Sequence, residues 1–138
     1  MSFSNLFIKD GIGKLELSEL SQALDAIFNY SHSAIELYDT DGKLLDINQS
    51  SLSIFGIESK KEIESFNFYD DPNITPERRN ELNEGKAVKY KTVIDFDEVK
   101  KKNIFKTNKS GKVSLDVVII PIKENEKISR ILFIGNPV

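Results

Sequence analysis

Alternating apolar and polar positions dominate the second half of the chain. Between residues 88 and 97 every second residue is apolar or a threonine and most of the others are charged, a period that predicts a half-buried strand. Two further apolar runs, 113–122 and 128–135, are separated by polar turns. Three sequential strands joined by short turns predict an antiparallel meander. The inward positions predicted for the first of them are Val88, Tyr90, Thr92, Ile94 and Phe96.

A hairpin is predicted earlier in the chain. Asp41-Gly42 separates two apolar-rich runs, 35–38 and 43–47, and glycine accepts the positive φ that such a turn requires. Asn48 ends the second strand and can cap a following helix through its side-chain oxygen. Gly56 is expected to end that helix. The first half therefore predicts two more strands and a short helix.

Three other helical segments are predicted from periodicity and capping residues. Residues 18–30 carry an apolar face at helical spacing, with Ser18 as the expected N-cap. Residues 59–62 have the Ser-x-x-Glu pattern of a capping box. Thr75 and Pro76 open a polar helix over 77–85. The segment 66–77 between them is aromatic, acidic and interrupted by prolines, which predicts an irregular loop with at most one helical turn.

The first half of the chain resembles a PAS domain, and the resemblance continues over residues 20–135. It implies an α+β fold, in which a five-stranded antiparallel sheet carries short helices on one face and an N-terminal amphipathic helix precedes it. The expected organisation is a lead-in segment over 1–16 and a single PAS-like domain over 17–138. The residues that carry the resemblance are Tyr38, Asp39, Asp41, Gly42, Leu45, Ile47, Asn48, Phe55 and Gly56.

Composition narrows the function classes. A length of 138 residues suits one domain, and a net charge of -3 argues against a dedicated nucleic-acid-binding protein. The absence of cysteine excludes disulfides, thiolate zinc sites and cysteine nucleophiles. No apolar run approaches 18 residues, and the first residues lack the pattern of a signal peptide, so no membrane span and a cytoplasmic location are expected.

Candidate catalytic and metal-binding residues are sparse. His32 is the only histidine, and the helix predicted over 77–85, where PAS proteins that hold haem commonly carry one, has none, so haem is not expected. Without cysteine, cysteinyl-flavin photochemistry is excluded, whereas non-covalent flavin is not. Asp70 and Asp71 are assigned to a solvated loop, and the lysine-rich stretch 100–112 to a solvated surface that binds no nucleic acid. No catalytic motif is present, and we expect a non-catalytic module.

The remaining candidate site is a pocket between the sheet and its helices. Its side chains either fill the space themselves or leave room for a small molecule of unknown identity. The residues expected to bind a ligand or cofactor are Asn48, Leu52, Phe55, Phe66, Phe68, Tyr69, Tyr90 and Thr92. Further candidates for the lining are Leu37, Ile47, Val117, Ile119 and Phe133.

The resemblance implies a sensory module of a bacterial two-component system. Such a module binds a small molecule or mediates dimerisation, and relays a signal to an output domain such as a histidine kinase. The first alternative is a constitutive homodimerisation module with a self-filled core; the second is a small α+β enzyme. A homodimer is expected through the sheet face and the apolar face of the N-terminal helix, formed by Leu17, Leu20, Leu24, Ile27 and Phe28.

Overall fold

The computed structural model describes residues 16–138, which form two units divided after Ser31. The first unit contains helix α2 (Leu17–Tyr30), and the second contains the sheet with its helices. Of the predicted lead-in segment, only Glu16 belongs to the described residues. The single domain expected over 17–138 stays a prediction.

Helix α2 begins two residues before the start predicted from Ser18 as N-cap. Its N-cap is Glu16, not Ser18, because Glu16 and Glu19 form a reciprocal capping box that satisfies two of the free backbone N–H groups. The apolar residues predicted for one face all lie within the helix. In the part of the chain that the structure describes, no helix is long and apolar enough to cross a bilayer.

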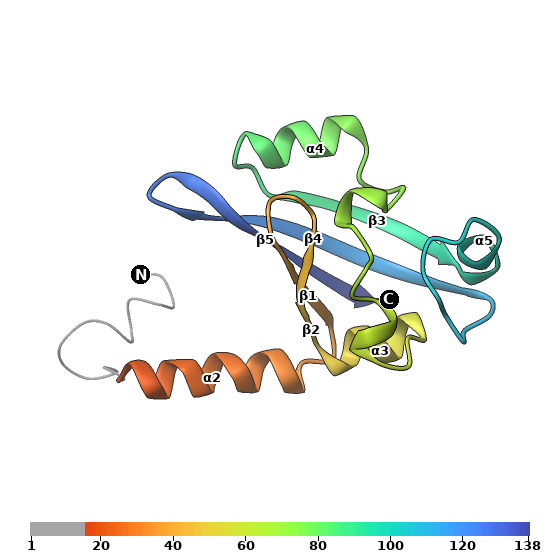
Figure 1. The fold of residues 1–138 in the computed structure, drawn as a ribbon, viewed down its shortest axis with the longest axis horizontal. Helices are drawn as coiled ribbons and strands as arrows, with labels where there is room; N and C mark the ends of the chain where they lie inside the picture. The colour runs from red at the N-terminus through yellow and green to blue at the C-terminus, as the bar shows by residue number, and fades with distance from the viewer. Residues whose placement is uncertain (1–15) are drawn as a thin grey trace. The chain divides into compact units, whose positions relative to one another are not determined.

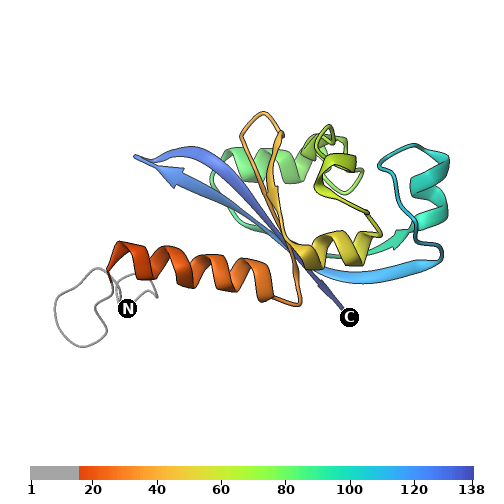
Figure 2. The ribbon, with the colours of Figure 1, turned by 60° about the horizontal axis from the view of Figure 1, so that its bottom comes forward.

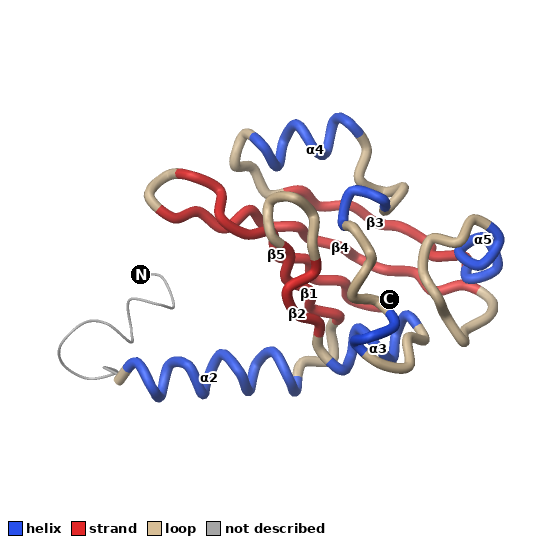
Figure 3. The backbone as a smooth tube through the Cα atoms, viewed as in Figure 1, coloured by secondary structure: helices blue, strands red, loops and turns tan. Residues whose placement is uncertain are grey.

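Five antiparallel strands form one sheet, in the spatial order β2-β1-β5-β4-β3 (Figure 1). The predicted hairpin corresponds to β1 and β2, and the predicted meander to β3, β4 and β5. Figure 3 shows the turn end of the β4–β5 hairpin projecting past the other strands. The strands are β1 (Ala34–Tyr38), β2 (Leu44–Ile47), β3 (Val88–Asp95), β4 (Lys112–Glu124) and β5 (Lys127–Pro137).

Short helices cover one face of this sheet, as Figure 2 shows for α3 and α4. The predicted α+β architecture is therefore confirmed. The core consists of the side chains between the two layers, and it includes Phe68, Ile47, Leu115 and Ile119, which are almost completely buried. The helices are α3 (Gln49–Phe55), α4 (Pro76–Asn83), α5 (Phe96–Lys101) and the 3₁₀ turns η1 (Lys60–Glu62) and η2 (Phe68–Asp70).

Two further local predictions were wrong. Strand β3 ends at Asp95, whose carboxylate accepts hydrogen bonds from the backbone N–H groups of Asp97 and Glu98 and so caps a helix, α5, that was predicted as strand. Ser59 makes no side-chain capping bond, and only a 3₁₀ turn follows it. Glu62, the expected partner of Ser59, forms an ion pair with Lys106 at 3.4 Å instead.

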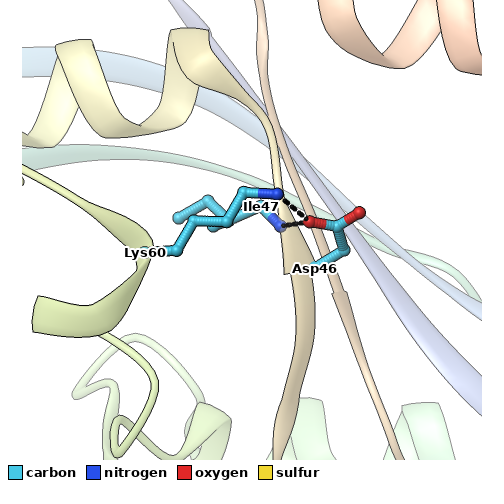
Figure 4. A network of polar contacts seen from close by, with 3 residues as sticks. All are labelled: Asp46, Ile47 and Lys60. Carbon is cyan, nitrogen blue, oxygen red and sulfur yellow. Dashed lines mark hydrogen bonds and ion pairs between the residues drawn. The ribbon is translucent and has the colours of Figure 1, made fainter.

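Side-chain contacts tie the covering segments to the sheet. Oδ1 of Asp46 in β2 accepts from the backbone N–H of Ile47 at 2.8 Å and from Nζ of Lys60 in η1 at 2.7 Å (Figure 4). At the end of α3, the Thr107 hydroxyl donates to the carbonyl of Phe55 at 2.6 Å. The loop after α5 is thereby fixed against α3, and the two segments enclose the space above the sheet.

Candidate functional site

A cavity of about 300 Å³ lies between the inner face of the sheet and the segments that cover it. Strands β1, β3, β4 and β5 contribute its floor, and α3, η2 and the residues around α5 contribute its walls. Most of the lining is apolar, and a few polar groups converge on it, which is the usual composition of a small-molecule site.

Aromatic rings form much of the wall. Phe105, from the loop after α5, meets Phe55 and Phe66 edge to face, with ring centroids 6.0 and 6.3 Å apart. Phe68 packs against Tyr38 with centroids 5.0 Å apart, and Phe133 lines the cavity from β5. These rings come from five separate segments, so the cavity depends on the complete tertiary fold.

Glu36, on β1, is the buried ionisable group of this cavity. The hydroxyl of Tyr38 donates to its Oε1 and the hydroxyl of Ser51 to its Oε2. Burial raises the pKa of Glu36, although both hydrogen bonds act in the opposite direction. A carboxylate can accept about four hydrogen bonds, so two donors leave it with capacity for a further partner.

A second polar group lies around Asp71, in the loop after η2. Its Oδ1 accepts from the backbone N–H of Asn73 at 2.9 Å, and burial raises the pKa of its carboxyl. The Asn73 side chain in turn accepts from the Thr92 hydroxyl at 3.0 Å. The Arg78 guanidinium stacks over the Tyr90 ring, 4.1 Å from its centroid, and donates to the Asn73 carbonyl.

The structure brings five of the eight sequence-predicted binding residues together on this cavity. They are Phe55, Phe66, Phe68, Tyr90 and Thr92. Val117 and Phe133 from the wider candidate set also line it, whereas Ile47 and Ile119 are buried in the core beside it.

Asn48, Leu52 and Tyr69 do not line the cavity. The Asn48 side chain accepts from the N–H groups of Ile35 and Ser51, and donates to the carbonyl of Ser33. It is therefore a buried link between β1 and α3. Leu52 belongs to the apolar core, and the Tyr69 hydroxyl donates to the Thr40 carbonyl at 3.0 Å.

Two residues of the cavity were misassigned from the sequence. Leu37 was expected to line it, but side chains alternate along a strand, and Glu36 and Tyr38 occupy the inner face of β1. Asp71 was assigned to a solvated loop, yet it faces the cavity. One sequence signal could have identified Glu36. It is the single acidic residue of an otherwise apolar strand, and it lies two positions from Tyr38 and therefore on the same face of the strand.

The described residues contain no group of three or more histidine, cysteine, aspartate or glutamate side chains placed to hold a metal ion. His32 is exposed and lies away from the cavity lining. The lining of the site combines aromatic and aliphatic side chains with the carboxyl groups of Glu36, Asp71, Asp95 and Glu98.

Comparison with known proteins identifies the fold. No family model matches the sequence, and no curated protein matches it. Among solved structures, a domain of a sensory box sensor histidine kinase/response regulator from Geobacter sulfurreducens matches with a TM-score of 0.67 and 16% identity, covering 88% of this chain and 96% of that one. The PAS domain of an HTR-like protein from Haloarcula marismortui matches with a TM-score of 0.61 and 20% identity, covering 88% and 94%.

A third match, the PAS domain of a protein from Colwellia psychrerythraea, has a TM-score of 0.63 and 20% identity and covers 87% of this chain and 97% of that one. In each case the similarity extends over nearly the whole solved domain.

Proposed function

Because the chain has the PAS fold, we propose that it is a non-catalytic sensory module that binds a small molecule and relays its presence to an output domain such as a histidine kinase. The observation that carries this proposal is the cavity of about 300 Å³, whose apolar wall surrounds the buried carboxyl of Glu36. A similar domain in a sensor histidine kinase from Geobacter sulfurreducens supports the signalling role.

The connection between β1 and α2 suggests how ligand binding in the cavity could affect the rest of the protein. Glu36 on β1 pairs directly with Phe133 on β5, and both side chains line the cavity. Only the short segment 31–33 separates β1 from the end of α2. A ligand that contacts Glu36 therefore acts on β1, the strand that directly follows α2, and we propose that β1 transmits the signal to this helix.

The proposed partner is a second copy of the chain. The apolar residues of α2 share one face, and a helix with such a stripe is stabilised when the stripe packs against another apolar surface. Pairing of two α2 helices, with a contribution from the sheet face, would satisfy this requirement. The cytoplasmic location expected from the sequence stays a prediction.

One observation favours the alternative, a constitutive dimerisation module without a ligand. Both carboxyl oxygens of Glu36 already accept hydrogen bonds from protein hydroxyls. Each oxygen of Glu36 would then have a hydrogen-bond donor even when the cavity is empty.

A thermal-shift screen with a cavity-filling variant separates the two functions. Val117 lines the cavity from β4, whereas its neighbour Val118 faces the other side of the sheet. A compound at about 100 times its dissociation constant adds about 2.7 kcal/mol of apparent stability. We expect such compounds to stabilise the wild type and Val118→Phe but not Val117→Phe. Stabilisation of all three proteins alike, or of none, would contradict binding in the cavity.

A further inference from the structure

The cavity combines aromatic walls with an excess of acidic over basic side chains. Four acidic residues line it, Glu36, Asp71, Asp95 and Glu98, against a single basic one, Lys102. Lys102 lies 3.6 Å from Glu98 in an ion pair, and Asp95 caps α5. These two acids at the α5 side are therefore already engaged, which leaves two carboxyl groups to consider.

Glu36 and Asp71 form no ion pair with any described residue. Glu36 accepts from two hydroxyl groups, and Asp71 accepts from the backbone N–H of Asn73 and also interacts with the Asn73 side chain. The Arg78 guanidinium stacks on the Tyr90 ring and donates to the carbonyl of Asn73. It forms no ion pair with Asp71, although its charge opposes the rise in the pKa of Asp71 that burial causes. Each carboxyl group thus has acceptor capacity left, and a cation delivered into the cavity would meet it.

Glu36 and Asp71 flank the same pair of aromatic residues. The Tyr38 hydroxyl donates to Glu36, the Tyr38 ring packs against Phe68 with centroids 5.0 Å apart, and the Asp71 N–H donates to the Phe68 carbonyl at 3.2 Å. Burial is the main cause of the raised pKa of Glu36, and the charge of Asp71 adds to it. Two carboxyl groups in a largely apolar space destabilise each other when both are ionised. A bound cation would remove this repulsion and the desolvation cost of both groups at once.

The aromatic walls favour the same ligand. The faces of aromatic rings attract cations, and they also bury an apolar body of matching size. Five phenylalanines line the cavity and can supply such contacts: Phe55, Phe66, Phe68, Phe105 and Phe133. A phosphate or carboxylate would instead meet several acids and one lysine that is already paired.

Building on the function proposed above, we propose that the ligand is an organic cation, an amine on an aromatic or aliphatic body, with Glu36 and Asp71 as acceptors for the ammonium group. The apolar body would lie against the phenylalanine walls. The ligand is thus defined by its positive charge and its apolar body. The two residues proposed to bind its ammonium group were not among the binding residues predicted from the sequence.

The test uses three indole compounds that differ in charge. Tryptamine carries an ammonium group, tryptophol a neutral hydroxyl and indole-3-acetate a carboxylate, on the same ring. Isothermal titration calorimetry at neutral pH compares their affinities. Hydrogen bonds to charged groups are stronger than neutral ones, so we expect tryptamine to bind about tenfold or more tightly than tryptophol, with indole-3-acetate the weakest.

Two pairs of variants assign the preference to the proposed residues. Glu36→Gln and Asp71→Asn each remove one carboxylate but retain hydrogen-bonding capacity, and we expect either to reduce the preference for tryptamine by about tenfold. Glu58→Gln and Asp70→Asn make the same changes at exposed positions and should leave the preference intact. Thermal melts establish that each variant is folded, and Asp71→Asn provides the test if Glu36→Gln fails to fold.

The outcomes distinguish this inference from the function on which it rests. Tryptophol or indole-3-acetate binding as tightly as tryptamine would overturn the cationic ligand while leaving a small-molecule sensor in place. Binding of tryptamine with an unchanged preference in both Glu36→Gln and Asp71→Asn would overturn the assignment of the site. Failure of all three compounds to bind would also overturn the inference, and the screen with Val117→Phe then decides the proposed function separately.

Discussion

Gly42 lies where the β1–β2 turn meets the loop that carries η2. Its φ of 89° is in the left-handed region, and its carbonyl accepts from the backbone N–H of Phe68 at 2.8 Å. A Cβ at this position would collide with the Asn67 side chain and lie 2.8 Å from Cδ2 of Tyr69. We expect Gly42→Ala to lower the free energy of unfolding by about 1–3 kcal/mol, through backbone strain and this collision.

The matched control is Gly111→Ala. Gly111 also has a positive φ, 77°, but a Cβ there would have no atom within 4 Å. It therefore reports backbone strain alone. Urea denaturation of both variants measures the difference, and equal losses would contradict the close packing of the turn against Asn67.

The Glu36 carboxyl predicts a pH dependence of stability. Burial raises its pKa in the folded protein above the ordinary value of 4.5, and burial acts on Asp71 in the same direction. The unfolded chain therefore releases these protons at a lower pH than the folded protein does. Stability is greatest below the ordinary pKa values and is lost as the pH rises through the raised pKa of each group.

Glu36→Gln removes one of these two titrations. Measured by urea denaturation between about pH 4 and about pH 8, the loss of stability with rising pH should be smaller in this variant than in the wild type. Glu58→Gln, an exposed substitution of the same kind, is the control. If the unfolding free energy of Glu36→Gln falls with pH as steeply as that of the wild type, the raised pKa of Glu36 does not contribute to the pH dependence.

Glu36 also shows where residue-scale prediction fails. The run 35–38 contains three apolar residues and one acid, and the sequence favoured Leu37 as the inward residue. In the structure Glu36 and Tyr38 point inward, and the buried carboxyl group of Glu36 is satisfied by the Tyr38 hydroxyl and by the hydroxyl of Ser51 from α3. Such a partner from another element cannot be recognised from the strand alone.

At the scale of elements, Asn48 connects three segments. It is 1% exposed, and its side chain bonds to Ile35, Ser51 and Ser33. Asn48→Ala removes an N-cap and leaves buried backbone groups without partners, so we expect a loss of about 2 kcal/mol or more. Thr75→Ala removes the half-buried cap of α4 and should cost about 1 kcal/mol. Chemical denaturation gives both values, and equal costs would contradict the linking role of Asn48.

Three features with local signals were predicted correctly. The Asp41-Gly42 turn, the Asn48 cap and the Thr75-Pro76 helix start each depend on neighbouring residues, and all three are confirmed. Helix α5 was missed because Phe96 continues the alternation of β3. Only the capping bonds of Asp95 show that the strand has already ended.

The proposed pairing of α2 predicts a change in oligomeric state. Leu24 lies on the apolar stripe, and Gln22 lies on the opposite side of the helix. Leu24→Glu would place a charge in an apolar interface, so we expect a dimer to become a monomer in light scattering after size exclusion. Gln22→Glu should leave the dimer intact. A dimer that persists in Leu24→Glu would contradict pairing through this stripe.

For the whole molecule, the fold was more predictable than the cavity. The order of elements and their alternating patterns define the sheet and the covered face. The volume left between the layers depends on how Phe105, from the loop after α5, meets Phe55 and Phe66. Phe105 is about fifty positions from Phe55 and about forty from Phe66 in the sequence, and the turn and period rules used for local elements do not determine these contacts.

The central claim is that this cavity accommodates a small molecule. Native mass spectrometry of protein purified without added ligand tests it most directly, with Val117→Phe prepared in parallel. We predict an additional small-molecule mass on the wild type that is lost on denaturation and is absent from Val117→Phe. Identical unliganded masses for both proteins, or the same added mass on both, would contradict it.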